Sequence, residues 1–112
     1  MELHVGLSVT TTVSPDGGAV LSVRGEIDHG NADELRSAIQ SVLASRRPHT
    51  VRLDLGLVTF LDSGAVGALV ASHRMAAAEG AQLVVASTSP FVSRQLDIAG
   101  VADLLGAPHT TA

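Results

Sequence analysis

The chain has 112 residues, which is enough for one domain with a modest hydrophobic core and too few for a second. Hydrophobic residues make up 46% of the chain but aromatic residues only 2%, so we expect a core of Val, Leu, Ile and Ala. Seven arginines, no lysine and eleven acidic residues give a net charge of −4, which argues against non-specific nucleic-acid binding. The absence of cysteine excludes disulfides and thiolate metal sites.

The N-terminal sequence MELHVGLSV has neither the basic segment nor the long apolar segment of a signal peptide. The longest apolar run, residues 64–71, is far shorter than a membrane span. We therefore expect a soluble cytoplasmic protein that makes no contact with a membrane.

Two strands joined by a tight turn are predicted first. Residues 8–13 are rich in Thr and Val, as in a strand with one solvated face. Residues 14–18, Ser-Pro-Asp-Gly-Gly, are a strong turn signal, because Pro presets φ and Gly accepts positive φ. Residues 19–24 alternate apolar and polar side chains, which is the period of a half-buried strand. The pattern predicts a hairpin, followed by an exit loop over residues 25–30.

A first helix is predicted after this loop. Asn31 is its expected N-cap, and Glu34 three residues later would complete a capping box. The helix is expected to end around Arg46 and Arg47, since cations favour the negative end of the helix dipole and Pro48 follows. Its apolar stripe is predicted to be Leu35, Ala38, Ile39, Val42 and Leu43.

A buried strand and a second helix are predicted at the centre of the chain. The strand covers residues 51–55, a connector of seven residues follows, and the helix opens at Asp62-Ser63-Gly64 and ends at Gly80. A short strand over residues 83–86 should run parallel to the preceding strand, because a helix separates the two. The inner stripe of the second helix is predicted to be Val66, Leu69, Val70, His73 and Ala77.

A third helix is predicted to begin with Ser89 as N-cap and Pro90 as its first residue. Gly100 would end it in a Schellman motif, and residues 102–105 would add an edge strand or a turn. Its apolar positions are predicted to be Phe91, Val92, Gln95, Ile98 and Ala99.

The element order is therefore ββαβαβα, which indicates an α/β fold with a mixed sheet of four or five strands and helices mainly on one face. We expect a single domain over residues 1–112, with its core at about residues 8–105 and a C-terminal tail at 106–112.

Ser63 is the residue whose position points most directly to chemistry. It follows Asp62 at the predicted start of the central helix, and Gly64 leaves its hydroxyl uncovered. Two interpretations are open. Ser63 could be a helix-start residue that satisfies free N–H groups, or it could accept a phosphate, which those N–H groups and the helix dipole would stabilise. We interpret Asp62 as the N-cap rather than as a base.

A serine hydrolase is an alternative interpretation of the same residues. The residues around Ser63 lack the glycine that a nucleophile elbow places two positions before its serine. His73 would lie roughly 15 Å along the helix, beyond hydrogen-bond reach. Asp28 and His29 could contribute a base only from another loop.

An acidic pocket is a further alternative. Asp28, Asp54 and Asp62 could gather at strand ends, as in phosphoaspartate receivers or a Mg²⁺ site. The absence of lysine weakens this interpretation, because such pockets usually hold a basic residue that binds phosphoryl oxygens. Neither glycine-rich phosphate-binding motif is present, so ATP binding is not indicated and no cofactor is predicted.

The most specific motifs of the chain lie in four segments, which are VRGEIDH (23–29), VRLDLG (51–56), TFLDSG (59–64) and LDIAGV (96–101). Together they resemble STAS domains, and most closely the bacterial anti-sigma-factor antagonists. The similarity runs from about residue 19 to residue 105. The family pattern usually reads Asp-Ser-Ser/Thr-Gly-Leu, whereas residues 62–66 are Asp-Ser-Gly-Ala-Val.

The resemblance implies a non-enzymatic binding module that phosphorylation switches. In that family the serine equivalent to Ser63 is phosphorylated by the cognate anti-sigma factor, an ATP-dependent serine kinase. The unphosphorylated form binds that factor and frees the sigma factor, so transcription is regulated. The implied partners are this kinase and a phosphatase for the phosphorylated form, with no nucleic acid. The implied partner-binding residues are Asp28, His29, Asp62, Ser63, Gly64 and Gly67.

Another role remains open within the same family. The chain could be the STAS module of a different assembly, such as a lipid-transport or stress-signalling complex, in which Ser63 is never phosphorylated.

Overall fold

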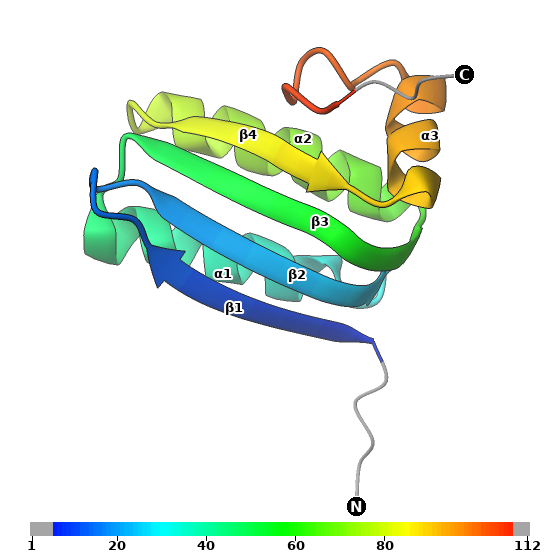
Figure 1. Cartoon of the computed structure of the whole chain (residues 1–112), viewed down its shortest axis with the longest axis horizontal. Helices are drawn as coiled ribbons and strands as arrows, with labels where there is room; N and C mark the ends of the chain where they lie inside the picture. Colours follow the sequence, from blue (N-terminus) through cyan, green and yellow to red (C-terminus); the bar gives the residue numbers. More distant parts are fainter. Residues whose placement is uncertain (1–5, 109–112) are drawn as a thin grey trace, which may run out of the picture.

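The computed structural model describes residues 6–108, which form a four-stranded sheet and three helices (Figure 1). The predicted element order and the α/β class are confirmed. In chain order the elements are β1 (Leu7–Val13), β2 (Ala19–Ile27), α1 (Ala32–Arg46), β3 (Thr50–Leu61), α2 (Ser63–Ala78), β4 (Gln82–Thr88) and α3 (Pro90–Ala99).

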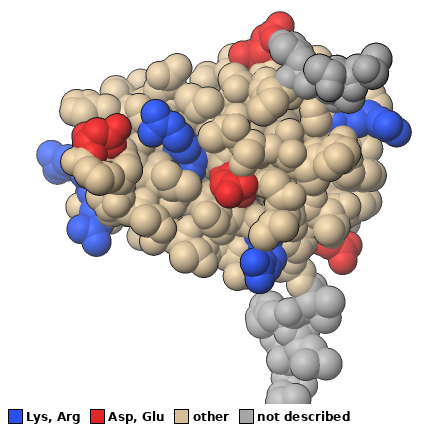
Figure 2. Space-filling model, in the orientation of Figure 1, with Lys and Arg blue, Asp and Glu red and all other residues tan. Residues whose placement is uncertain are grey.

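The sheet is mixed, and its strands lie in the order β1-β2-β3-β4. The hairpin strands β1 and β2 are antiparallel, whereas β3 runs parallel to both β2 and β4, as predicted for strands that a helix separates. Both crossover helices, α1 and α2, cover the same face of the sheet, and α3 lies at the end where β3 ends (Figure 1). The opposite face is open, and most of the surface on this side is uncharged (Figure 2).

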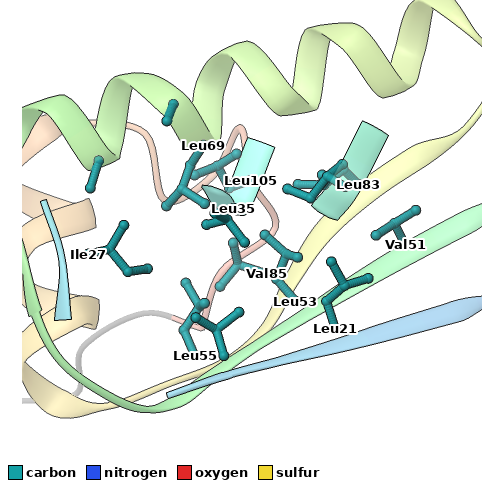
Figure 3. Close-up of a cluster of buried hydrophobic side chains, with 14 of the residues drawn as sticks. Leu21, Ile27, Leu35, Val51, Leu53, Leu55, Leu69, Leu83, Val85 and Leu105 are labelled. Atoms are coloured by element: carbon teal, nitrogen blue, oxygen red, sulfur yellow. The ribbon is translucent and has the colours of Figure 1, made fainter. Parts of the chain in front are cut away.

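The core lies between the sheet and the helices α1 and α2. Alternate residues of β2 and β3, such as Leu21 and Leu53, point into it, together with Leu35 of α1 and Leu69 of α2 (Figure 3). No aromatic side chain is among the buried residues of the described part of the chain, so the core is aliphatic, as its composition predicts.

All four strands are longer than predicted: β1 by one residue, β2 and β4 by three each, and β3 by seven. The connector expected at residues 56–62 is wrong, because β3 continues to Leu61, and the loop expected at 25–30 begins only after Ile27. Ile27 pairs with Leu61, so each strand gives the other a partner for its last residues. The β2–β3 pairing shifts register twice, between Ser22 and Arg24 and between Gly25 and Glu26, as at a β-bulge. Gly25, with φ +106°, is needed there because a Cβ would meet the carbonyl oxygen of Gly6.

The buried side of α1 is confirmed, but those of α2 and α3 are right only at Leu69 and Val92. In α2 only Leu69 of the predicted stripe is fully buried, because the other buried positions are the small residues Ala65, Ala68, Ser72 and Ala76. The sequence of α2 is apolar on almost every side, so polarity does not mark its outer face. In α3 the buried residues are Val92, Ser93 and Leu96, whereas the predicted Phe91 and Ile98 are exposed.

The segment after α3 forms turns rather than a fifth strand. Gly100 ends α3 with φ +74°, as predicted for a Schellman motif. Leu105 is buried, and its carbonyl accepts a hydrogen bond of 2.8 Å from the Val85 N–H of β4. Ala107 is also buried, and residues 109–112 of the predicted tail lie outside the described residues.

Candidate functional site

The candidate site begins at the N-terminus of α2, which an aspartate caps. Asp62 is the N-cap, as predicted, and its backbone is extended with φ −98° and ψ 179°. Its Oδ1 accepts a hydrogen bond of 2.8 Å from the Ala65 N–H, and its backbone carbonyl accepts one of 3.0 Å from Val66. The first turn of α2 is therefore held by Asp62, without help from the side chain of Ser63.

The same carboxylate ties α2 to the loop between β2 and α1. Asp62 Oδ2 accepts a hydrogen bond of 3.0 Å from the His29 N–H and lies 3.3 Å from Nδ1 of the exposed His29 ring. The pKa of Asp62 lies below the ordinary value of 3.8, chiefly because of the hydrogen bond from Ala65 and secondarily because of those from His29. The ionised form is therefore the one that holds both segments together.

Gly64 lets these two segments approach each other. A Cβ at this position would lie 2.9 Å from the His29 Cβ and 3.2 Å from its Cα. A larger residue would push the His29 loop away from the start of α2. Gly64 is thus required because the start of α2 packs closely against His29, which lies 35 residues earlier in the chain.

Ser63 is exposed, and within residues 6–108 its hydroxyl makes no hydrogen bond. The N–H groups of Ser63 and Gly64 are also without partners in this part of the chain, as expected for the first residues of a helix. Gly67 lies one turn further along α2, on the same side as Ser63, and open space surrounds the position of its missing Cβ. No side chain at position 67 therefore covers Ser63, and its hydroxyl is accessible.

Asp28 organises the loop before α1. Its Oδ1 accepts hydrogen bonds from the N–H groups of Gly30 (2.9 Å) and Asn31 (3.0 Å). The capping box predicted for Asn31 and Glu34 is wrong, because the Asn31 side chain makes no cap bond to α1. It bonds instead to the Glu26 carbonyl and the Asp28 N–H, which ties the end of β2 to the loop.

The alternative chemistries find little geometric support. The ring of His73 lies 3.2 Å from the Leu83 carbonyl, and His29 contacts Asp62 rather than Ser63, so no Ser–His hydrogen bond is present in the described residues. Asp54 accepts hydrogen bonds from the Ser87 hydroxyl and the Gly56 N–H, which lower its pKa. Within residues 6–108 no three His, Asp or Glu side chains gather closely enough to hold a metal ion.

An exposed aromatic pair lies near the site and was not singled out from the sequence. Phe60 of β3 stacks on Phe91 of α3, with ring centroids 5.8 Å apart and an interplanar angle of 28°. The two are the only aromatic residues of the chain, and each is 39% exposed. Phe60 is three residues before Ser63, and the rarity of aromatics was the signal that could have drawn attention to it.

None of the three helices in the described residues combines the length and the apolar character needed to cross a lipid bilayer.

Comparisons with known proteins place this geometry in a family. The model of the STAS domain family matches residues 9–111. An anti-sigma F factor antagonist of Paenibacillus polymyxa is 26% identical over 85 residues, which cover 76% of this chain and 73% of that protein. A STAS-domain containing protein of Pseudomonas aeruginosa (strain UCBPP-PA14) is 32% identical over 99 residues, which cover 88% of this chain and 96% of that protein.

A solved structure gives the same result in three dimensions. The crystal structure of an anti-sigma factor antagonist from Mycobacterium paratuberculosis superposes with a TM-score of 0.80 and 27% identity, over 99% of this chain and 92% of that one. The resemblance noted in the sequence is therefore confirmed. The chain belongs to the STAS domain family, and within it to the domains that are similar to anti-sigma factor antagonists.

Proposed function

We propose that this protein is an anti-sigma factor antagonist whose binding is switched by phosphorylation of Ser63. In its unphosphorylated form it binds an anti-sigma factor that is also a serine kinase, and the sigma factor is released. A phosphatase returns the phosphorylated form to the binding state. The protein acts in the cytoplasm and as a binding module rather than as an enzyme.

The observation that carries this proposal is the division of roles between Asp62 and Ser63. Because Asp62 caps α2, the Ser63 hydroxyl is exposed and uses none of its hydrogen-bonding capacity within the described residues. A kinase can reach such a hydroxyl without unfolding the helix. The unpartnered N–H groups of Ser63 and Gly64 and the positive end of the helix dipole favour a phosphate at this point.

The binding surface in this proposal consists of the start of α2 and the loop before α1. It comprises the six residues named from the sequence: Asp28, His29, Asp62, Ser63, Gly64 and Gly67. Phosphorylation adds a charge of about −1.5 to −2 next to the carboxylate of Asp62, which precedes Ser63 in the chain. Like charge and loss of solvation at an interface can cost several kcal/mol, and about 2.8 kcal/mol already weakens binding a hundredfold.

Phosphate mapping tests the proposal. The full chain is incubated with ATP and the kinase-type anti-sigma factor of the same organism, and phosphopeptides are identified by mass spectrometry. We expect phosphate on Ser63 alone, none on Ser63→Ala, and wild-type incorporation on Ser37→Ala, a control that removes an exposed hydroxyl from α1. Modification of Ser87, Thr88 or Ser89 in place of Ser63 would contradict the assignment.

Two other results would point to the alternatives. Stable binding to a partner that never phosphorylates Ser63 would favour a STAS module of another assembly, a role left open by the Pseudomonas aeruginosa relative, which is named only for its domain. Labelling of Ser63 by a fluorophosphonate would favour a hydrolase, which we do not expect, because the described residues hold no histidine bonded to Ser63.

A further inference from the structure

The two edges of the sheet differ in how their backbone groups are satisfied. At the β4 edge, the Val85 N–H donates to the Leu105 carbonyl at 2.8 Å, and the Leu83 carbonyl lies 3.2 Å from Nδ1 of His73. The turns after α3 thus cover this edge, as Figure 1 shows along the upper side of the sheet. The β1 edge has no helix, strand or turn of the described residues on its outer side (Figure 1).

The register of the hairpin identifies the free groups of β1. The Glu26 N–H donates to the Gly6 carbonyl at 2.8 Å, and the Ser14 N–H donates to the Gly18 carbonyl at 2.8 Å. Antiparallel pairing alternates, so the even-numbered residues of β1 use their backbone groups toward β2. The odd-numbered residues direct theirs outward, where they have no partner within residues 6–108; these are Leu7, Val9, Thr11 and Val13.

The β1 edge also lacks the devices that normally prevent strand pairing. Its sequence, LSVTTTV, holds no charged residue and no proline. Its pairing with β2 is regular over all seven residues, without a bulge that would turn the edge away. Natural sheet edges are usually protected by charges, prolines or bulges, so an unprotected edge of this length is suited to adding another strand.

We propose that β1 pairs with β1 of a second copy of this chain, antiparallel and about a two-fold axis at Thr10. In this register residue i of one copy lies opposite residue 20 − i of the other, so all seven residues of β1 take part in the pairing. It sets Leu7 opposite Val13 and Val9 opposite Thr11, all of which have outward backbone groups. The two sheets become one continuous sheet of eight strands.

The side chains favour a second copy over an unrelated strand. On the helix side, Leu7 and Val9 are half-buried against the core while Val13 is 45% exposed, and the pairing brings Val13 of each copy against Leu7 of the other. On the open side, Ser8 meets Thr12 and Thr10 meets Thr10, which are favourable hydroxyl pairs. No charges meet, although each chain has a net charge of −4.

The assembly closes at two copies, because each copy has one open edge and the pairing is isologous. Two strands bury a small area, so we expect a weak dimer with a Kd on the order of 10 to 100 µM. Ser63 lies outside β1, so the dimer would present two copies of the α2 start.

Sedimentation equilibrium of the full chain tests this pairing, at concentrations from about 5 to about 500 µM. Wild type should shift from monomer to dimer. Thr10→Lys and Thr10→Glu should each weaken dimerisation at least tenfold, because like charges would meet at the axis. An equimolar mixture of the two should restore a dimer, because opposite charges then meet. Ser22→Lys, at the exposed position opposite Thr10 on the neighbouring strand β2, is the control and should dimerise like wild type.

Amide hydrogen exchange gives an independent measurement on the wild-type chain. The amides of Val9 and Thr11 should gain protection as concentration rises, whereas that of Thr10, already bonded to β2, should not. A monomer at all concentrations would overturn the proposal. So would a dimer that Thr10→Lys leaves intact, or a mixture of the two charged variants that stays monomeric.

Discussion

Two helices of this domain place a serine at their first turn and use its hydroxyl in opposite ways. At α3, Ser89 is itself the N-cap: its half-buried hydroxyl donates to the Val58 carbonyl at 2.6 Å and accepts from the Val92 N–H at 3.3 Å. At α2, Asp62 is the N-cap and the following Ser63 hydroxyl is exposed. A serine at the N-cap, such as Ser89, is structural, whereas a serine one position later, such as Ser63, is available for chemistry.

The local function of a helix-start serine therefore depends on which residue holds the cap. A serine whose hydroxyl is bonded on both sides cannot be modified without loss of the helix start. A serine that follows a capping carboxylate can be modified while the cap stays in place. The following variants test whether the two helix starts differ in this way.

The largest expected effect on stability is the difference between two alanine variants, Ser89→Ala and Ser63→Ala. Ser89→Ala removes a cap and leaves the Val58 carbonyl without its partner, so we expect a loss of about 2 kcal/mol in the free energy of unfolding. Ser63→Ala should change it by less than about 0.5 kcal/mol, because surface substitutions away from caps cost little. Urea unfolding curves measure both, and equal losses would remove the distinction between the two starts.

Two glycines of α2 offer a sharper test of the packing at its start. Gly67→Ala should stabilise the protein by about 0.5 to 1 kcal/mol, because alanine favours the helix and open space surrounds this position. Gly64→Ala should lower stability by about 1 kcal/mol, because the new methyl group displaces His29. Thermal melts measure the stability of both variants. An increase in melting temperature for Gly64→Ala as well as for Gly67→Ala would show that the His29 loop moves aside without cost.

Asp28 has a structural role that its position in the sequence did not indicate. Because its carboxylate holds the N–H groups of Gly30 and Asn31, Asp28→Ala should cost about 1 kcal/mol, whereas Asp28→Asn should cost a few tenths, since an amide oxygen still accepts hydrogen bonds. Binding to the anti-sigma factor should weaken for both variants if the charge itself contacts the partner. Recovery of full affinity in Asp28→Asn would show that Asp28 acts only through the loop.

The smallest effect concerns the cap of α2 under acid conditions. The pKa of Asp62 is lowered below 3.8 in the folded protein, so its ionised form stabilises the fold above that pH, and the contribution is lost as the pH falls through the lowered pKa. Asp62→Asn keeps an accepting oxygen but does not titrate. Between about pH 5 and about pH 2.5, the variant should therefore lose less stability than wild type. Identical pH profiles would show that the contribution of Asp62 to stability does not depend on its charge.

Much of this architecture follows from the sequence alone, because hydrophobic period, turn residues and cap residues agree for most elements. The helix starts at Asp62 and Ser89 and the stop at Gly100 were all predicted correctly, since each depends on residues next to one another in the chain. The stripe of α1 was predicted for the same reason, because charged and apolar residues alternate clearly along it.

The remaining features depend on contacts between distant segments. The extension of β3 past Gly56 needs the end of β2 as a pairing partner, and the Asp62–His29 contact joins residues 33 positions apart. The inner face of α2 is set by close packing of alanines, which polarity does not reveal. Asn31 occupies the N-cap position of α1, as predicted, but its side-chain amide bonds to Glu26 and Asp28 instead of to the helix.

The affinity of two Ser63 variants for the anti-sigma factor tests the proposed switch most directly. Ser63→Ala removes the acceptor hydroxyl and little else, so in calorimetry it should bind as tightly as the unphosphorylated wild type. Ser63→Glu puts a negative charge at the positive end of the α2 dipole, which the fold tolerates. That charge should oppose docking and weaken binding by about tenfold, or about 1.4 kcal/mol, less than a phosphate would. Circular dichroism should show both variants folded. Equal affinities of Ser63→Ala and Ser63→Glu would contradict the charge switch and leave Ser63 as an ordinary helix-start residue.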